Sequence, residues 1–276
     1  MRRIVAIAAR EALEGFRNKW AAAAALLLAA LALTLGFLGS APVGGVNASP
    51  LDVEIVSLSS LTILLLPLIA LVVSHDAIAG EAERGTLALV LATPVARWEA
   101  IVGKFLGHMF LLALATIAGF GIAAAALWAS AAEIDANGWR SLAAMIALSV
   151  LLGAVFVALG YVASAWARDR ATAAAIAVGL WLLFAILFDM ALLGLLVADR
   201  GRHLDATAVA ALLFLNPCDL YRLLTIGDAT GAARFSGMSS LAANASPSPH
   251  WLLAGLVAWV LVPLWLAIRL LERRDI

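Results

Sequence analysis

The sequence predicts an all-α integral membrane protein with six transmembrane helices, for two reasons. Of the 276 residues, 64% are hydrophobic and only 13% are charged, which lies outside the range of soluble domains. The apolar residues also gather into runs of roughly 20, the length at which a helix crosses a bilayer. We therefore treat residues 1–276 as a single transmembrane domain.

Six apolar runs are long enough to span a membrane. They occupy residues 20–39, 57–74, 105–128, 142–165, 173–198 and 251–270. The first run could instead be a signal peptide, but the region before it is long and contains Glu11 and Glu14, and five more runs follow. We expect it to be retained as an anchor.

The segment before the first span, residues 1–19, is predicted to form an amphipathic helix on the inner leaflet. Its apolar and its charged residues occupy opposite stripes of a helix. The apolar stripe holds Val5, Ala9, Ala12, Leu13, Phe16 and Trp20, and the charged stripe holds Arg3, Arg10, Glu14 and Arg17. A basic tail that only orients the first span is the alternative, and both place this segment at the cytoplasmic surface.

The distribution of Lys and Arg predicts the orientation of the spans. Thirteen of these residues fall on one side of the predicted spans and five on the other. Because basic residues concentrate in cytoplasmic loops, both termini are expected in the cytoplasm. Residues 75–104 then form a cytoplasmic loop, and residues 199–250 form a large outward-facing region.

The cytoplasmic loop contains the charged turn "GEAERGT", which spans residues 80–86 and precedes a leucine-rich run. This pattern predicts a short amphipathic helix with Glu81, Glu83 and Arg84 in solvent and the leucines packed beneath. Such a surface suits a soluble cytoplasmic partner. A solvated loop without any partner explains the residues equally well.

The outward region is predicted to hold a re-entrant helical hairpin. Its apolar stretch 206–215 is too short to span. Asn216 can cap a second short helix with Pro217 at its first position and Asp219 in its first turn, and Arg222 follows Asp219 by three residues. The hairpin is expected to act either as a gate or platform for a periplasmic partner, or as a structural plug.

Asp189 stands out because it is a carboxylate inside a predicted span. Burying a charge there costs at least ~2.5 kcal/mol, so its side chain should face protein or water. Possible partners are Asn or hydroxyl groups of a neighbouring helix, or Arg222 of the hairpin. Asp189 then serves either as a switch or path residue, or only as a helix-packing contact.

Several functions are disfavoured by the sequence. A net charge of zero argues against nucleic acid as the main partner. There is no phosphate-binding loop for ATP, no G-x-S-x-G of an intramembrane hydrolase, and no clear internal repeat of a secondary transporter. The His, Met and Cys residues form no metal-ligand motif, so we expect neither a metal site nor another cofactor in this chain. They are His75, His108, Met109, Met145, Met190, Cys218, Met238 and His250.

The loop resembles the cytoplasmic loop of ABC-2 type permeases, the membrane subunits of one class of ABC transporter. The resemblance is carried by an acidic residue, "GTL", a leucine-rich run, "TP", a basic residue and "GK" before an apolar helix. These residues are Glu81, Gly85, Thr86, Leu87, Leu91, Thr93, Pro94, Arg97, Gly103 and Lys104. In that family the loop holds a coupling helix that docks into the ATPase subunit, so Glu81, Glu83, Arg84, Gly85 and Thr86 are expected to contact an ATPase.

Four further phrases, "PLIALVVSHDAIAGE", "GKFLGH", "LLFAILFDMALL" and "LNPCDLYRL", are similar to the permeases of nitrous oxide reductase maturation systems. That resemblance covers nearly the whole chain. It implies a bacterial inner-membrane homodimer with two copies of a separate ATPase, which binds ATP and Mg, and a periplasmic β-helical copper-handling protein. The complex would support maturation of the copper centres of nitrous oxide reductase. The permease would act as a mechanotransmitter or, alternatively, export a copper or sulfur species, a small molecule or a lipid.

Overall fold

All elements of the computed structural model are helices. The structure describes residues 2–17, 50–87, 95–129, 136–199, 206–227 and 248–273, together with residues 23, 26, 27, 30, 33 and 34. Within these residues there is no strand. The first predicted span, 20–39, lies largely outside the described residues.

Five helices of the described chain are long and apolar enough to cross a membrane. Three are single helices, namely α6 (Arg97–Ala129), α7 (Ala136–Trp166) and α13 (Pro249–Glu272). The candidate Ile55–Glu83 runs from α3 (Pro50–Ser74) through a turn into the short helix α4 (Ala79–Glu83). The fifth consists of two α-helices joined by a π-helix, α8 (Arg170–Leu182), η1 (Leu183–Leu187) and α9 (Phe188–Asp199). Each overlaps one predicted span, so the prediction of a multi-pass helical membrane protein is confirmed. The π-helix was not predicted.

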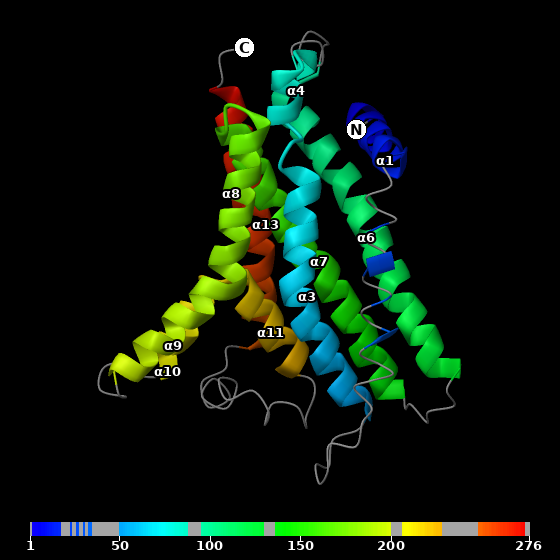
Figure 1. Cartoon of the computed structure of the whole chain (residues 1–276), viewed down its shortest axis with the longest axis vertical. Coiled ribbons are helices and arrows are strands. Elements are labelled where there is room, and N and C mark those ends of the chain that lie inside the picture. The colour runs from blue at the N-terminus through cyan, green and yellow to red at the C-terminus, as the bar shows by residue number, and fades with distance from the viewer. Residues whose placement is uncertain are drawn as a thin grey trace.

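Helix α7 forms the centre of the bundle. It packs against α3, α6, α8, α11 and α13. Of its most apolar stretch, 61% is buried inside the protein, which is the largest share among the span candidates. Helix α8 and its continuation into α9 lie at the edge, and only 11% of their most apolar stretch is buried. In Figure 1, α9 leaves the direction of α8 and runs away from the bundle.

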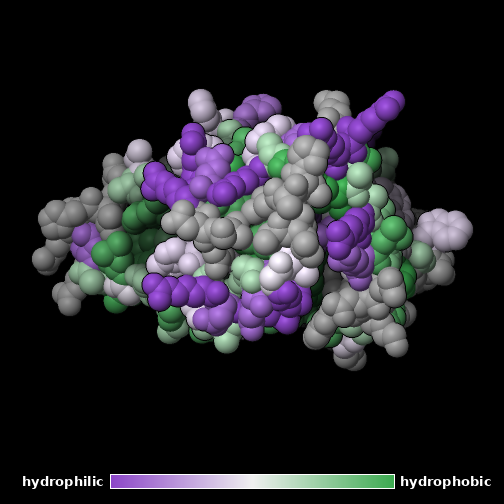
Figure 2. Space-filling view, turned by 90° about the horizontal axis from the view of Figure 1, so that it is seen from above, coloured by the Kyte–Doolittle hydropathy of each residue, from purple (hydrophilic) through white to green (hydrophobic). Residues whose placement is uncertain are grey.

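Three segments that carry charged residues lie at one end of the bundle. They are helix α1 (Arg2–Arg17), the short helix α4 (Ala79–Glu83) and the C-terminal end of α13 (Figure 1). Viewed from that end, hydrophilic side chains gather over this face and hydrophobic ones lie toward its margins (Figure 2). This is the end that the basic residues predict to be cytoplasmic.

Helix α1 packs along α6 through a face that combines apolar side chains with Glu11. The approach is close, because a Cβ added to Gly107 of α6 would lie 2.8 Å from the carbonyl oxygen of Ala8. Val5 and Leu13 belong to the predicted apolar stripe and are 65% and 66% exposed. The helix therefore has a protein-facing side, an exposed apolar side and a charged side.

The predicted hairpin consists of α10 (Ala206–Leu213) and α11 (Pro217–Gly227), which are bent by 111° at the break between them. Asn216 precedes α11, and its Oδ1 accepts a hydrogen bond from the Cys218 amide at 3.0 Å. The predicted cap and first position of this helix are therefore confirmed. Helix α11 packs against α3, α7, α13 and η1.

Candidate functional site

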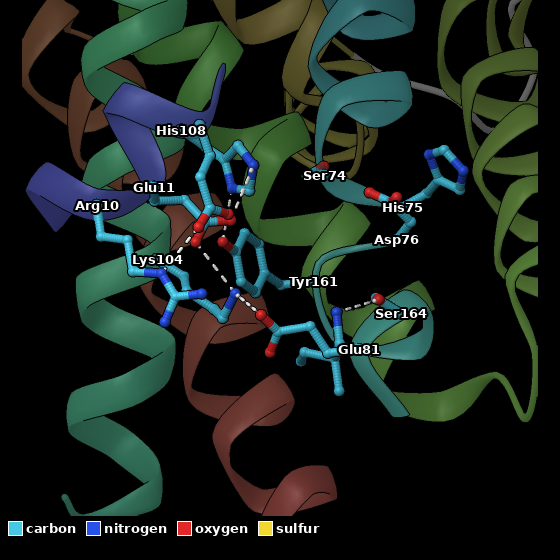
Figure 3. A network of polar contacts seen from close by, with 12 residues as sticks. Arg10, Glu11, Ser74, His75, Asp76, Glu81, Lys104, His108, Tyr161 and Ser164 are labelled. Atoms are coloured by element: carbon cyan, nitrogen blue, oxygen red, sulfur yellow. Dashed lines mark hydrogen bonds and ion pairs between the residues drawn. The ribbon is translucent and has the colours of Figure 1, made fainter. Parts of the chain in front are cut away.

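Five polar side chains from four helices meet at the charged end of the bundle (Figure 3). They are Glu11 of α1, Glu81 of α4, Lys104 and His108 of α6, and Tyr161 of α7, and we call them the coupling network. Lys104 Nζ lies 2.7 Å from Glu81 Oε1 and 3.1 Å from Glu11 Oε2. His108 Nδ1 lies 2.7 Å from the Tyr161 hydroxyl, and His108 Nε2 lies 3.6 Å from Glu11 Oε1.

Lys104 is the centre of this network because it bridges two carboxylates that come from different elements. Its side chain is 8% exposed, and those of Glu11 and Glu81 are each 15% exposed. Charges removed from water in this way are tolerated only when they are paired, and loss of one partner leaves an uncompensated buried charge. The network therefore fixes α1 and α4 to the same point of α6.

A cavity of about 450 Å³ adjoins the coupling network. Glu11, Glu81, Lys104 and His108 line it, and Asp76 is among the other polar residues of its wall. Most of the apolar lining residues belong to α3 and α6. The cavity thus combines both signs of charge at the edge of the apolar bundle.

A second group of contacts fixes α4 to α7. The first amides of a helix lack partners within the helix, and here the Ser164 hydroxyl of α7 accepts from the amides of Ile78 and Ala79, both at 2.9 Å. Ser164 is fully buried. Helix α4 is therefore positioned by the protein interior and not only by its neighbours in the chain.

A third group fixes the same loop to the start of α8. The Arg170 side chain donates to Asp76 Oδ2 at 3.0 Å, and the Arg170 amide donates to Glu83 Oε2 at 3.2 Å. Asp169 caps α8 by accepting from the amide and hydroxyl of Thr172 at 2.8 and 2.9 Å, and these bonds lower the pKa of its carboxyl group. The loop is thus tied to α6, α7 and α8.

The structure separates the five predicted ATPase-contacting residues into two groups. Glu83, Arg84, Gly85 and Thr86 are exposed, and Gly85 has φ +71°, which favours glycine at the end of α4. The expectation that Glu81 lies in solvent is wrong, because its carboxylate turns inward to the buried ammonium of Lys104. Residues 88–94, including most of the predicted leucine run, lie outside the described residues.

Sequence reasoning did not identify the coupling network. In the sequence, Glu11 bears only on the signal-peptide alternative, Lys104 is part of a motif, His108 is one of the scattered metal-ligand candidates, and Tyr161 has no distinguishing pattern. One signal was available, because Lys104 and His108 are four residues apart and therefore share one face of an apolar helix. Polar residues placed in this way within a span are expected to face protein.

A second polar cluster joins the hairpin to the broken helix, and we call it the hairpin latch. Arg222 donates to Asp219 Oδ1 at 2.7 Å and to Asp189 Oδ2 at 2.9 Å. Asn216 Nδ2 donates to Asp219 Oδ2 at 3.0 Å and to the carbonyl oxygen of Phe184, in η1, at 3.1 Å. Of the partners predicted for Asp189, Arg222 is the one found.

The hairpin latch is largely removed from solvent. Asn216 is fully buried and Asp219 is 2% exposed, whereas the side chains of Asp189 and Arg222 are about one quarter exposed, at 25% and 27%. Asp189 Oδ1 is buried without a hydrogen-bond partner among the described residues. In the part of the chain that the structure describes, no three His, Cys, Asp or Glu side chains gather as metal ligands would.

These features define a multi-pass helical membrane protein whose polar groups form one network at its charged end and another between a broken span and a hairpin. Residues 5–276 match the ABC-2 family transporter protein model. The chain belongs to the ABC-2 transporter family, so the predicted resemblance is confirmed. Membership implies a transport subunit that associates with an ABC ATPase and the membrane.

Two relatives match over nearly their whole length. The chain is 42% identical over 271 residues to the probable ABC transporter permease protein NosY of Pseudomonas aeruginosa strain PAO1, and the match covers 98% of each chain. It is 40% identical over 276 residues to the probable ABC transporter permease protein NosY of Stutzerimonas stutzeri, and the match covers 99% of each chain. The resemblance to permeases of this kind therefore extends over the described spans and both polar clusters.

Proposed function

We propose that this chain is the permease subunit that couples ATP hydrolysis by a separate ATPase to periplasmic maturation of the copper centres of nitrous oxide reductase. The proposal is supported by the near full-length similarity to two proteins named as NosY permeases. It also agrees with the four sequence phrases that resemble this kind of permease. The chain itself contributes no ATP site and acts as a mechanotransmitter.

The observation that carries the mechanical part of the proposal is the anchoring of α4. This helix of five residues is joined to α6 through Lys104, to α7 through Ser164 and to α8 through Arg170. A force applied to a short helix held in this way moves three spans together. The exposed residues Glu83 and Arg84 provide the surface on which an ATPase exerts that force.

The assembly that we propose is a homodimer of this chain in the bacterial inner membrane, with two ATPases in the cytoplasm and a β-helical copper-handling protein in the periplasm. Both termini face the cytoplasm. The exposed apolar side of α1, with Val5, Leu13 and Phe16, rests on the inner leaflet. Its charged side then faces water and phospholipid headgroups.

Transmission without transport is supported by the way that polar groups in the spans are paired. Ser59, Thr62 and Thr116 are buried, and each donates to the carbonyl oxygen four residues earlier in its own helix. Ser149 and Tyr221 bond to each other at 2.9 Å. Groups satisfied in this way do not offer a path for a hydrated ion.

The second candidate function is export of a copper or sulfur species or another small solute. It is favoured by the cavity beside the coupling network, which has charged walls and a volume of about 450 Å³. Under this alternative the cavity is an entry site at the cytoplasmic end. Uptake assays with inverted vesicles distinguish the two functions, because a transmitter accumulates no copper or sulfide inside them.

Co-purification tests the proposed assembly. We expect the chain, extracted in mild detergent from the cells in which it occurs naturally, to carry an ATPase in equal ratio together with a periplasmic protein. Mass spectrometry of the intact complex gives the composition. Recovery of the chain without any ATPase under these conditions would contradict the proposal.

A further inference from the structure

The π-helix η1 lies in the middle of a span candidate that extends from Arg170 to Asp199. A π-turn contains one residue more than an α-turn, and single π-turns inside α-helices are frequently found at functional sites. Its hydrogen bonding is visible at Phe188, whose amide donates to the carbonyl oxygen of Leu183, five residues earlier. If the turn became α-helical, the residues beyond it would rotate by about 100° and shift by about 1.5 Å.

The hairpin latch binds this helix on both sides of the position where such a rotation would begin. Asn216 donates to the carbonyl oxygen of Phe184 inside η1, and Arg222 binds Asp189, the second residue of α9. This contact adds a hydrogen bond to a carbonyl group inside η1. Hydrogen bonds between buried polar groups are stabilising, so the Asn216 amide favours the π form. Rotation of α9 would carry Asp189 away from Arg222.

The same helix begins beside the predicted cytoplasmic loop, residues 75–104, which we call the coupling loop. Arg170, its first residue, binds Asp76 and Glu83 beside α4. One helix therefore connects the surface proposed for the ATPase to the hairpin. Between these two attachments, η1 is the segment with irregular hydrogen bonding.

We propose that η1 is a two-state hinge, held in its π form by Asn216 and by the Asp189 to Arg222 ion pair, through which movement of the coupling loop reaches the hairpin. This inference rests on the proposed coupling function and names its route. Movement of Arg170 with the coupling loop twists α8. The twist converts η1 to α-helix, rotates α9 and releases the hairpin latch.

The hinge is tested by measuring the distance between spin labels on either side of η1. Val178 of α8 is 46% exposed and Met190 of α9 is 65% exposed, so Val178→Cys and Met190→Cys accept labels. The natural cysteine of the chain, Cys218, is 1% exposed and does not compete for the reagent. The labelled permease is diluted with an excess of unlabelled permease, so that a dimer carries at most one labelled copy. It is measured in lipid nanodiscs with its ATPase, without nucleotide and with ATP trapped by vanadate.

We expect one main distance without nucleotide and a second population, displaced by several ångströms, in the trapped state. Asn216→Ala should populate the second distance without nucleotide. Asp189→Asn, which keeps the shape of the side chain and removes its charge, should do so to a smaller extent. Ser149→Ala is the matched control, because it removes a hydrogen bond between the hairpin and α7 and leaves the contacts of the hairpin latch with η1 and α9 in place.

The two proposals fail in different ways. A wild-type permease that binds no ATPase or shows no nucleotide-dependent change at the hairpin would contradict the coupling function itself. A hairpin that responds to nucleotide while the distance across η1 stays constant, in the wild type and in both latch variants, would overturn the hinge. An Asn216→Ala result equal to that of Ser149→Ala would also overturn it. If Asn216→Ala does not fold, the comparison of Asp189→Asn with the wild type decides the question.

Discussion

Lys104 Nζ lies 2.7 Å from Glu81 Oε1, and this ion pair joins the third predicted span to the short helix of the cytoplasmic loop. The same ammonium lies 3.1 Å from Glu11 of α1. Because all three groups are largely buried, they behave as one unit. The first prediction addresses this unit directly.

Lys104→Met should destabilise the protein strongly, since it leaves two carboxylates buried without their cation. Removing one partner of a buried ion pair costs about 3 to 5 kcal/mol. The expected result is a lower unfolding temperature in detergent and loss of ATPase coupling. Lys104→Met combined with Glu11→Gln and Glu81→Gln should recover most of the lost stability, and failure of this rescue would show that the charges are not the reason for the loss.

The exposed part of the coupling loop should determine ATPase affinity. Charge reversal by Glu83→Lys with Arg84→Glu is expected to weaken binding by about tenfold or more, because like charges across an interface cost several kcal/mol. Affinity is measured by titrating purified ATPase onto permease in nanodiscs. Glu272→Lys is the control, because it reverses an exposed charge at the last residue of α13, whose carbonyl oxygen binds Arg97 at the start of α6. Equal affinities of the two variants would contradict the role assigned to Glu83 and Arg84.

Contacts between residues close in the sequence could be predicted, whereas most contacts between helices distant in the sequence could not. The hairpin helix was predictable because Asn216, Pro217 and Asp219 follow local capping rules. The pairing of Asp189 with Arg222 was foreseen because a carboxylate in a span needs a partner. The inward direction of Glu81 was not foreseen, because Lys104 reaches it only through packing of helices distant in sequence.

The π-helix was also beyond the sequence analysis. Residues 173–198 form one uninterrupted apolar run apart from Asp189, and hydropathy has the same value for an α-turn and a π-turn. Nothing local in the apolar residues Leu183 to Leu187 requires a π-turn. The side chain that binds a carbonyl group inside η1 belongs to Asn216, which lies 32 residues later, just before α11.

Asp189→Asn and Asp189→Leu should behave differently. The amide can still accept a hydrogen bond from Arg222, so the Asn variant should fold and assemble. The Leu variant removes a partner from Arg222 at a cost of about 1 to 3 kcal/mol, so it should lower the yield of the complex or its coupled ATPase activity. Yield and nucleotide-stimulated turnover are the measurements. A Leu variant identical to the wild type in both would show that neither assembly nor coupling needs the carboxylate of Asp189.

The cap of α11 should control binding of the periplasmic protein. Asn216→Ala with Asp219→Ala is expected to cost on the order of 1 to 2 kcal/mol locally, which loosens the hairpin without removing it from the membrane. The variant should still dimerise and bind its ATPase but recover less of the periplasmic protein in pull-downs. Undiminished recovery, together with full copper loading of the client enzyme, would exclude the docking role.

The central claim is that this chain couples an ATPase to copper-centre maturation, and the most direct test is the copper content of nitrous oxide reductase. The enzyme is purified from cells that contain the ATPase and the periplasmic protein and have either this chain or an empty vector as the source of permease. Copper-loaded enzyme is expected only when the chain is present. Equal copper content in both preparations would contradict the coupling of an ATPase to copper loading by this chain.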